Sequence, residues 1–390
     1  MAFAYVPNLR FPEFQGEWEK CKVSDLLDFY STNSLSWDKL EYGTNAIENL
    51  HYGLIHVGLP TMVDLNKVKL PNIVSGNTPK NYELCKEGDI AFADASEDTN
   101  EVAKAVEFYN LKGKDVICGL HTIHGRDNQQ KTIVGYKGYA FSATAFHNQI
   151  RRIAQGTKIY SINSKNFSEC YIGIPSKEEQ TKIATLLRLL DERIATQNKI
   201  IEDLKKLKSA ISESLFNDIE GKAVTLSDIC NIIKGKQING EFLSDSGRYY
   251  VMNGGTEPSG YYDDYNVEAN TISISEGGNS CGYVQFNTSP FWSGGHCYTI
   301  QNIVRGVDNL YLYHYLKSKE DAIMKLRIGS GLPNIQKKDL AMFKIKIPTV
   351  EQQKAISTFL SSLERKAEIE ERAQNVIQKE KLYLLQHMFI

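Results

Sequence analysis

The 390-residue sequence lacks several features that would place it in a common class of protein. No apolar run approaches the length of about 18 residues that a membrane-spanning helix needs, so no membrane anchor is expected. The opening MAFAYVPNLRFPEF has prolines and an arginine where a signal peptide has an unbroken apolar stretch, so export is not expected. The seven cysteines include no CxxC pair, which is typical of reduced thiols in the cytoplasm.

Motifs for the common catalytic chemistries are also missing. The sequence has no P-loop, no dinucleotide-type GxGxxG, no NPP[YF] of amino-methyltransferases and no nucleophile elbow. Gly277 and Gly278 could cradle a phosphate, but no GK[ST] follows them, which favours a hairpin turn. Lone histidines such as His51 and His314 indicate core or surface residues. We therefore expect a chain without catalytic activity, and an enzyme with an unrecognised site is the alternative.

One segment has the spacing of a metal site. Cys118, His121 and His124 follow a C-x2-H-x2-H pattern that could ligate zinc. No second ligand pair lies nearby in the sequence, and in a strand the three side chains would not all point to one face. No metal is therefore predicted.

The charge balance also lacks the basic surplus of a typical nucleic-acid binder. The net charge is −2, whereas phosphate neutralisation normally requires an excess of Lys and Arg. DNA binding then requires an uneven distribution of charge or phosphate contacts from partner subunits. The 42% hydrophobic and 24% charged fractions are those of a globular protein, and the length predicts two to three domains.

An internal repeat organises the sequence. A shift of 173 residues, from Ile172 to Ile345, places IGIPSKEEQTKIATLLRLLDERI over IKIPTVEQQKAISTFLSSLERKA, and the match continues without a gap to Phe216 and Phe389. Upstream, GTKIYSINSKNF falls on GSGLPNIQKKDL, CGLHTI on GGHCYTI, and VSDLLDF on LSDICNI. Each half is thus a variable globular segment followed by a long helical segment.

Both helical segments have the periodicity of a coiled coil. From Ile183 the apolar positions alternate steps of four and three, interrupted by Gln197 and Lys208, and Glu370 and Lys381 interrupt the second copy. Proline precedes each helix, and Ser176 and Thr349 are expected N-caps. We expect the helices to pack on each other, with the polar positions fixing register; two independent core helices are the alternative. The predicted helix-pair seam comprises Ile183, Leu187, Leu190, Ile194, Ile201, Leu204, Ile356, Leu360, Leu363, Ile377 and Leu384.

The variable segments are predicted to be mixed α/β modules. Strand-like runs are DIAFADA, DVICGLHTI and KGYAFSATAF in the first half, and RYYVMNGG, NTISISEGG and GYVQFN in the second, where a helical YLYHYLKSKEDAIMKL follows. Basic and Asn side chains cluster near the glycine-rich turns, where they could bind phosphates or base edges; solvated surface charge is the alternative. The candidate DNA-binding residues are Arg126, Arg151, Arg152, Lys158, Lys234, Lys236, Asn253, Asn279, Arg327 and Lys337.

Four elements together resemble the specificity subunit of type I restriction-modification systems. These are PNLRFPEFQGEWEKCKVSDL, the twice-occurring P-x4-Q-x2-I with its helix, GLHTI, and YYVMNGGTEPSGYYDDYN. The resemblance spans essentially the whole chain, and the duplicated proline-glutamine-helix element is its most specific part. It implies an α/β (α+β) fold with two mixed α/β target-recognition domains separated by two long antiparallel coiled-coil helices. The expected segments are 1–20 (N-terminal), 21–175 (first recognition domain), 176–216 (first helix), 217–348 (second recognition domain) and 349–390 (second helix).

The resemblance also implies partners and a role. Each domain would read one half of a bipartite, asymmetric site in double-stranded DNA, and the helices would dock two methyltransferase subunits, through which restriction subunits join. S-adenosylmethionine, ATP and Mg are then expected on those partner subunits and no cofactor on this chain. A coiled-coil scaffold that does not contact DNA is the other alternative, which acidic recognition surfaces would favour.

Overall fold

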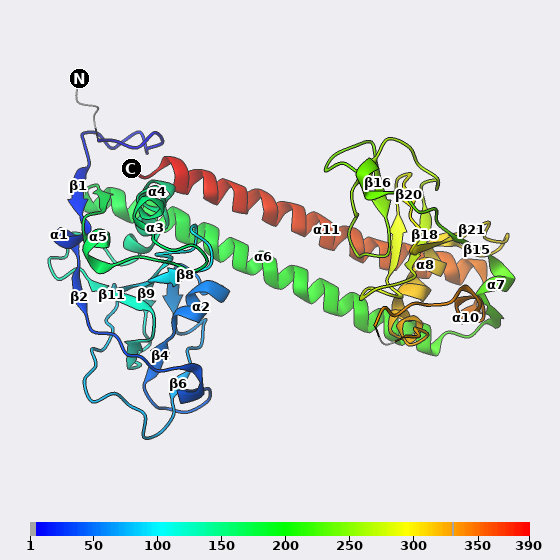
Figure 1. The fold of residues 1–390 in the computed structure, drawn as a ribbon, viewed down its shortest axis with the longest axis horizontal. Helices are drawn as coiled ribbons and strands as arrows, with labels where there is room; N and C mark the ends of the chain where they lie inside the picture. Colours follow the sequence, from blue (N-terminus) through cyan, green and yellow to red (C-terminus); the bar gives the residue numbers. More distant parts are fainter. Residues whose placement is uncertain (1–4, 330) are drawn as a thin grey trace. The chain divides into compact units, whose positions relative to one another are not determined.

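The computed structural model describes residues 5–329 and 331–390, which form two compact units. Unit 1 comprises Met1–Asn198 and Ala373–Ile390, and unit 2 comprises Lys199–Arg372. Two long helices, α6 (Lys177–Asp218) and α11 (Val350–His387), each contribute to both units (Figure 1). None of the helices in the described parts of the chain is long and apolar enough to cross a membrane.

Unit 1 is built around two sheets. In the larger one the strand order is β2-β11-β7-β9-β5, antiparallel except for the β5–β9 pair, and in the smaller one it is β10-β4-β6-β3. Two short antiparallel pairs, β1–β13 and β12–β8, complete the unit. The strands are β1 (Glu19–Lys22), β2 (Asp28–Tyr30), β3 (Leu40–Glu41), β4 (Glu48–Leu50), β5 (Met62–Asp64), β6 (Asn72–Ile73), β7 (Ile90–Ala93), β8 (Ala95–Ser96), β9 (Ala105–Asn110), β10 (Val116–Cys118), β11 (Thr122–Arg126), β12 (Tyr160–Ser161) and β13 (Tyr171–Ile174).

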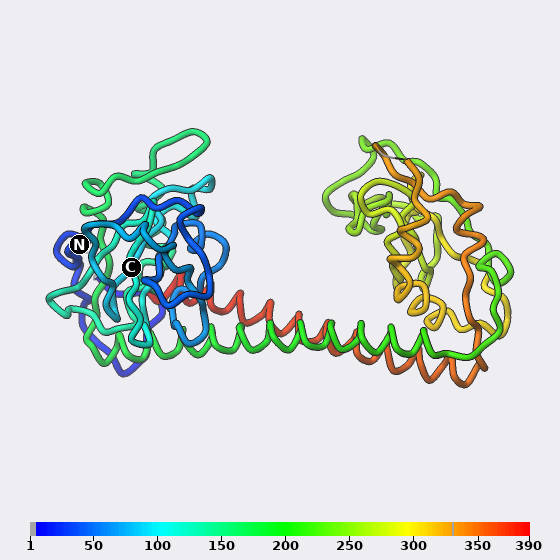
Figure 2. The backbone as a smooth tube through the Cα atoms, turned by 90° about the horizontal axis from the view of Figure 1, so that it is seen from below, coloured from blue at the N-terminus to red at the C-terminus, as the bar shows by residue number. Residues whose placement is uncertain are grey.

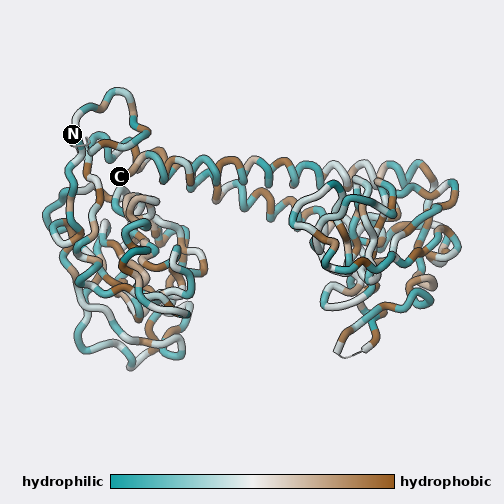
Figure 3. Tube along the Cα trace, turned by 45° about the horizontal axis from the view of Figure 1, so that its top comes forward, coloured by the Kyte–Doolittle hydropathy of each residue, from teal (hydrophilic) through white to brown (hydrophobic). Residues whose placement is uncertain are grey.

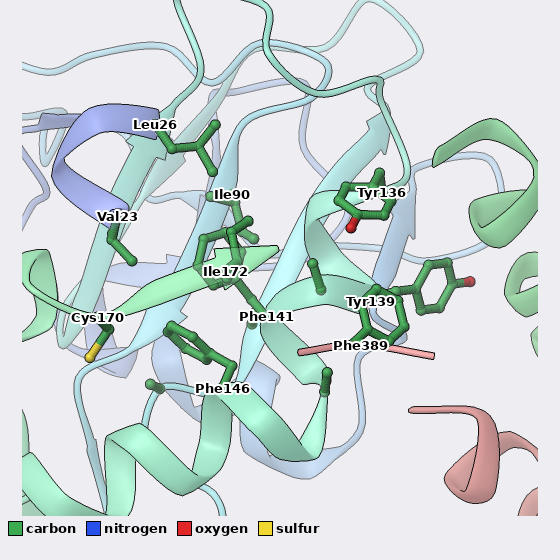
Figure 4. Packing of buried hydrophobic residues seen from close by; sticks show 14 of the residues in the cluster. Val23, Leu26, Ile90, Tyr136, Tyr139, Phe141, Phe146, Cys170, Ile172 and Phe389 are labelled. Atoms are coloured by element: carbon green, nitrogen blue, oxygen red, sulfur yellow. The ribbon is translucent and has the colours of Figure 1, made fainter. Parts of the chain in front are cut away.

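Short helices and the chain end close the core of unit 1. Figure 4 shows side chains from α1, β7, α3, α4 and β13 gathered with Phe389, which follows α11. Phe141 packs edge-on against both Phe92 and Phe146, with ring centroids 4.9 and 4.8 Å apart. The helices are α1 (Val23–Leu26), α2 (Tyr52–Val57), α3 (Lys137–Ser142), α4 (Thr144–Ile153) and α5 (Ser164–Ser168), with a 3-10 turn η1 (Trp37–Lys39).

Unit 2 contains a four-stranded antiparallel sheet of order β15-β21-β18-β19. A three-stranded sheet, β17-β16-β20, and the pair β14–β22 accompany it. Its strands are β14 (Lys222–Thr225), β15 (Asn231–Lys234), β16 (Tyr249–Met252), β17 (Tyr261–Tyr262), β18 (Thr271–Ser275), β19 (Val284–Asn287), β20 (Trp292–Ser293), β21 (Cys297–Gln301) and β22 (Lys344–Ile347). Its helices are α7 (Leu226–Ile229), α8 (Asn309–Ser318), α9 (Glu320–Met324) and α10 (Lys337–Ala341), with a 3-10 turn η2 (Gly240–Phe242).

The internal repeat appears as the same order of elements in both units. The start of α5 (Ser164) and that of α10 (Lys337) lie 173 residues apart, as do those of β13 (Tyr171) and β22 (Lys344). The sheets correspond as well, because β2-β11-β7-β9 and β15-β21-β18-β19 have the same order of equivalent strands. In each half, a globular module is followed along the chain by a long helix (Figure 2). The predicted mixed α/β modules with an internal repeat are therefore confirmed.

Most of the strand-like runs are strands, but KGYAFSATAF is not. Residues 137–146 form α3 and the first turn of α4. The first five residues of α3, Lys137 to Phe141, are all buried, so this helix has no polar face. A helix that is buried on every side does not show the 3.6-residue periodicity by which amphipathic helices are identified. The strand prediction for this run was wrong for that reason.

The duplicated proline-glutamine element anchors the start of each long helix. The buried amide of Gln180 donates to the carbonyls of Pro175 and Lys131, at 3.0 and 3.1 Å, and accepts from the amide of Ile133 at 2.9 Å. Each long helix therefore begins where a buried glutamine ties it to the module before it.

Gln353 repeats this arrangement in unit 2. Its amide donates to the carbonyls of Pro348 and Gly306, at 2.9 and 3.0 Å, and accepts from the amide of Asp308 at 2.8 Å. The predicted N-caps are confirmed as well, because the hydroxyls of Ser176 and Thr349 each accept a backbone N–H at 3.3 Å.

Within each unit the two long helices are linked by one tyrosine-acid-lysine triad. In unit 1, Asp191 of α6 pairs with Lys381 of α11 and accepts from the Tyr139 hydroxyl at 2.8 Å. In unit 2, Glu364 of α11 pairs with Lys208 of α6 and accepts from the Tyr313 hydroxyl at 3.0 Å.

The two triads are copies of each other. Asp191 and Glu364 lie 173 residues apart, as do Lys208 and Lys381, so each helix supplies one acid near its start and one lysine further on. An acid near the start of one helix that pairs with a lysine near the end of the other requires antiparallel helices. The expected role of Lys208 and Lys381 in helix pairing is therefore observed.

The predicted seam residues are buried or half-buried along both helices, and Figure 3 shows hydrophobic and hydrophilic residues alternating there. The first seam residues of each helix also pack into the core of their own unit, as Ile183 and Leu187 do in unit 1 and Ile356 and Leu360 in unit 2.

Candidate nucleic-acid interface

Each unit carries an acid-histidine corner where equivalent strands end. In unit 1, Asp94 follows β7 and His121 precedes β11; the Asp94 amide donates to the His121 carbonyl at 3.1 Å, and the His121 ring lies 3.1 Å from the Asp94 carboxylate. The amide of Ile162 donates to the Asp94 carbonyl at 3.0 Å. The His121 side chain remains about half exposed, at 49%.

The corner in unit 2 has the same connections. Glu276 follows β18 and His296 precedes β21; the Glu276 amide donates to the His296 carbonyl at 2.9 Å, and the Ile335 amide donates to the Glu276 carbonyl at 2.8 Å. The His296 ring lies 3.7 Å from the Glu276 carboxylate and its side chain is 62% exposed. Two equivalent histidines are thus presented on the surface at matching places in the two modules.

Around the corner in unit 2, several turns converge, which we call the glycine loops: residues 234–237, 253–255, 276–279, 294–296 and 333–335. Backbone hydrogen bonds of 2.8 to 3.0 Å join these loops to each other or to the residues directly beside them, from Lys236 to Ser293, from Gly294 to Met252 and from Gly278 to Pro333. The packing requires glycine at Gly235, because a Cβ there would lie 2.2 Å from the Gly294 carbonyl oxygen. The glycine-rich turns of this unit therefore lie together, with Lys234 and Lys236 on one of them.

The predicted cations and amides of unit 2 lie on or next to these loops. Lys234 forms an ion pair with Glu276 at 2.6 Å, and the half-buried Asn253 accepts the His296 amide at 3.1 Å. Burial and a hydrogen bond to Glu276 raise the pKa of Tyr298, so that hydroxyl remains a donor to this carboxylate. Four further predicted residues are exposed and project from the cluster or its flanks: Lys236, Asn279, Arg327 and Lys337.

The predicted residues of unit 1 do not gather in one place. Arg151 and Arg152 are exposed on the last turn of α4, where Arg151 donates to Asn100 at 2.7 Å, and Lys158 is exposed in the following loop. A groove of about 610 Å³ beside His121 is lined by the acids Glu97, Asp98 and Glu101 and by Lys104 among others. Arg151, through Asn100, and Lys158, next to the lining residue Ile159, thus lie at the edge of a groove whose charged lining is mainly acidic.

Arg126 has an internal role. It is 7% exposed, and its guanidinium donates two hydrogen bonds to Asp89 at 2.8 Å and one to Glu83 at 2.7 Å. It also lies over the Tyr30 ring, 4.4 Å from the centroid. Its donors are occupied inside the unit, so we do not retain it among the candidate DNA contacts.

Neither corner histidine was predicted from the sequence as a candidate DNA contact, and His121 entered only the C-x2-H-x2-H metal pattern. The alignment of CGLHTI with GGHCYTI already placed both in matching segments, but it did not indicate that each is paired with an acid from the preceding strand. That pairing depends on the register of β7 with β11 and of β18 with β21.

Comparisons with known proteins agree with the repeat. A family model described as "Type I restriction modification DNA specificity domain" matches residues 62–206 and again 219–379. The "Putative type I restriction enzyme MjaX specificity subunit" of Methanocaldococcus jannaschii is 25% identical over 406 residues, which cover 95% of this chain and 92% of that one.

Solved structures share the fold. The crystal structure of the type I restriction-modification S subunit from M. genitalium matches with a TM-score of 0.67 at 19% identity and covers 99% of both chains. A chain from a structure on complex assembly and conformational transition of the type I restriction-modification system matches with a TM-score of 0.59 at 14% identity, over 94% of this chain and 96% of that chain.

Proposed function

Because this chain belongs to the type I restriction modification DNA specificity family, whose role is to recognise a DNA target and not to catalyse, we propose that each unit reads one half of a bipartite site. The observation that carries the proposal is the duplicated acid-histidine corner. A surface feature that recurs at equivalent strand ends in both modules, on loops that otherwise differ, is what two readers of two different half-sites require. The differing loops also favour an asymmetric target.

In unit 2 the glycine loops are the proposed reading surface. The glycines of these turns have no side chain that would keep the backbone away from the duplex. The side chains of Lys236, Arg327 and Lys337 would contact phosphates, and that of Asn279 would contact a base edge. His296 stands at the centre of this surface, where either ring nitrogen can meet a base or a phosphate. In unit 1 the corresponding contacts are assigned to His121, Arg151, Arg152 and Lys158.

We further propose that the long helices dock two methyltransferase subunits, which in turn recruit the restriction subunits. Several large apolar side chains on these helices are exposed within their own units: Leu189, Val376 and Leu382 in unit 1, and Leu207, Phe359 and Ile369 in unit 2. Contiguous apolar patches mark protein-protein interfaces, and these side chains supply exposed apolar area on both helices for such a contact.

Methylome sequencing tests the bipartite reading. Replacing residues 21–171 with the corresponding module of a relative is expected to change one half of the methylated target and to leave the other half and the gap unchanged. A swap that changed both half-sites together would contradict independent reading by the two modules.

Salt-dependent DNA binding by the chain assembled with its methyltransferase tests the proposed surface. Arg327→Ala and Lys337→Ala should each weaken binding and reduce the salt dependence by about one phosphate contact. Lys222→Ala is the matched control, because Lys222 is also exposed but lies on the separate β14–β22 pair. Equal effects of all three substitutions would remove the glycine loops as the reading surface, and no DNA binding at all would favour the scaffold that does not contact DNA.

A further inference from the structure

Two cysteines and a histidine from separate segments meet in the interior of unit 1. Cys118 ends β10, His124 lies on β11, and Cys85 belongs to the segment before β7 that bridges to β10 through Leu84 and Ile117. One ligand atom from each of the three side chains lies within 4.8 Å of the others, and the two sulfurs are 3.6 Å apart. All three residues are buried, with His124 at 0% exposure.

The histidine is held with one ring nitrogen unpartnered. Its Nε2 lies 2.7 Å from Oδ2 of Asp89, a buried carboxylate that also accepts two hydrogen bonds from Arg126. Its Nδ1 is buried and has no hydrogen-bond partner. A buried imidazole nitrogen without a partner costs free energy, so this nitrogen needs an explanation.

We propose that Cys85, Cys118 and Nδ1 of His124 bind a zinc ion. Zinc is bound by thiolate sulfur at about 2.3 Å and imidazole nitrogen at about 2.0 Å in tetrahedral sites, which places two sulfurs about 3.8 Å apart, close to the spacing seen here. Binding forms two zinc–sulfur bonds and one zinc–nitrogen bond and releases the two thiol protons to solvent. The two thiolates balance the ion's charge, and a water molecule takes the fourth position.

The surroundings of the histidine are those of a metal ligand. A ligating histidine usually donates its other N–H to a carboxylate, which fixes the tautomer and orients the ring. Asp89 is the positioning residue for His124 in this sense, and Arg126 holds Asp89 in turn. No other group of three such residues gathers in the described parts of the chain.

The site would brace the acid-histidine corner of unit 1. Cys118 and His124 stand on either side of the loop that carries His121, and Cys85 fixes the segment leading into β7, after which Asp94 follows. The C-x2-H-x2-H pattern of Cys118, His121 and His124 predicted no metal site, because those three side chains do not share a face of one strand. In the structure His121 is turned to the surface, and Cys85, 33 residues upstream of Cys118, takes its place.

Metal analysis of the full-length chain tests the proposal. Protein produced with zinc in the medium and dialysed against a weak chelator should retain about one zinc per chain, and Cys118→Ser should retain almost none. Cys230→Ser is the matched control, because Cys230 is a buried free thiol of unit 2 outside the cluster, and it should retain the full amount.

A measurement on the wild-type chain keeps the test independent of variant folding. After exchange with cobalt(II), the protein should show thiolate-to-cobalt charge-transfer absorption and the intense visible bands of a tetrahedral ion. A wild-type chain that holds no zinc and gives no such spectrum would overturn the proposal. So would a Cys85–Cys118 disulfide in protein kept under reductant, because the pair would then be a redox bridge.

Discussion

The triad of unit 2 allows a quantitative test of what holds the two long helices in register. Lys208 and Glu364 have side chains that are only 21% and 28% exposed, and Glu364 also accepts the Tyr313 hydroxyl. Hydrogen bonds to charged groups contribute about 1.5 to 3 kcal/mol when buried, whereas exposed ion pairs contribute about 0.2 to 1 kcal/mol. For this half-buried pair we expect a coupling free energy of about 1 to 2 kcal/mol.

The assay is a double-mutant cycle with Lys208→Met, Glu364→Gln and the double variant, measured by urea denaturation followed through helix content. The neighbouring pair of Lys205 and Glu371 is the control, because it joins the same helices at 2.6 Å but its side chains are 64% and 41% exposed. Its cycle should give a coupling of about 0.5 kcal/mol or less. Coupling energies that agree within about 0.3 kcal/mol, the usual error of such cycles, would refute the assignment of register to the triad.

Three further outcomes are expected. Gln353→Ala, which leaves buried backbone groups without partners, should lower the free energy of unfolding by about 2 to 4 kcal/mol, whereas Gln352→Ala on the exposed side should cost less than about 1 kcal/mol in denaturation experiments. Burial lowers the pKa of His314 to about 4, whereas the imidazole pKa in the unfolded chain is near 6.5, so the unfolded chain binds the proton first as the pH falls. The free energy of unfolding should therefore decrease by up to about 3 kcal/mol between pH ~6.5 and pH 4. His314→Gln should flatten this pH dependence in denaturation experiments. Four residues inserted after Gln197 in α6 and four after Gln374 in α11 keep both triads and lengthen each helix by about 6 Å. Methylome sequencing should then show that the gap between the two half-sites is wider by about one or two base pairs, with both half-site sequences unchanged.

The long helices were predictable because their signals are local. Proline, a hydroxyl cap and a glutamine at fixed spacing precede an amphipathic pattern, and the structure starts the helices at Lys177 and Val350, one residue after the caps. Because the repeat contains the same proline, cap and glutamine pattern in both halves, the two long helices could be predicted together.

What the sequence did not reveal depends on contacts between distant residues. Cys85 meets Cys118 because a bridge forms between the segment before β7 and β10, and no spacing rule connects the two. Arg126 is basic and lies near a glycine, as a DNA contact would, yet the buried Asp89 holds it inside the unit. Charge and neighbourhood in the sequence do not show whether a cation's partner is a phosphate or a carboxylate of the same chain.

The duplicated triads have a consequence for how such a chain can be divided. A polypeptide that ends at Asp218 contains one recognition module and one long helix, with Asp191 and Lys208 both on that helix. Since the lysine partner of each acid sits at the equivalent place on the other helix, two copies of this half can complete both triads by pairing with each other. The helix pair is self-complementary, so a truncated gene product is expected to assemble as a symmetric dimer. If each module reads one half-site, as proposed above, that dimer would present the same reader twice and select a palindromic target.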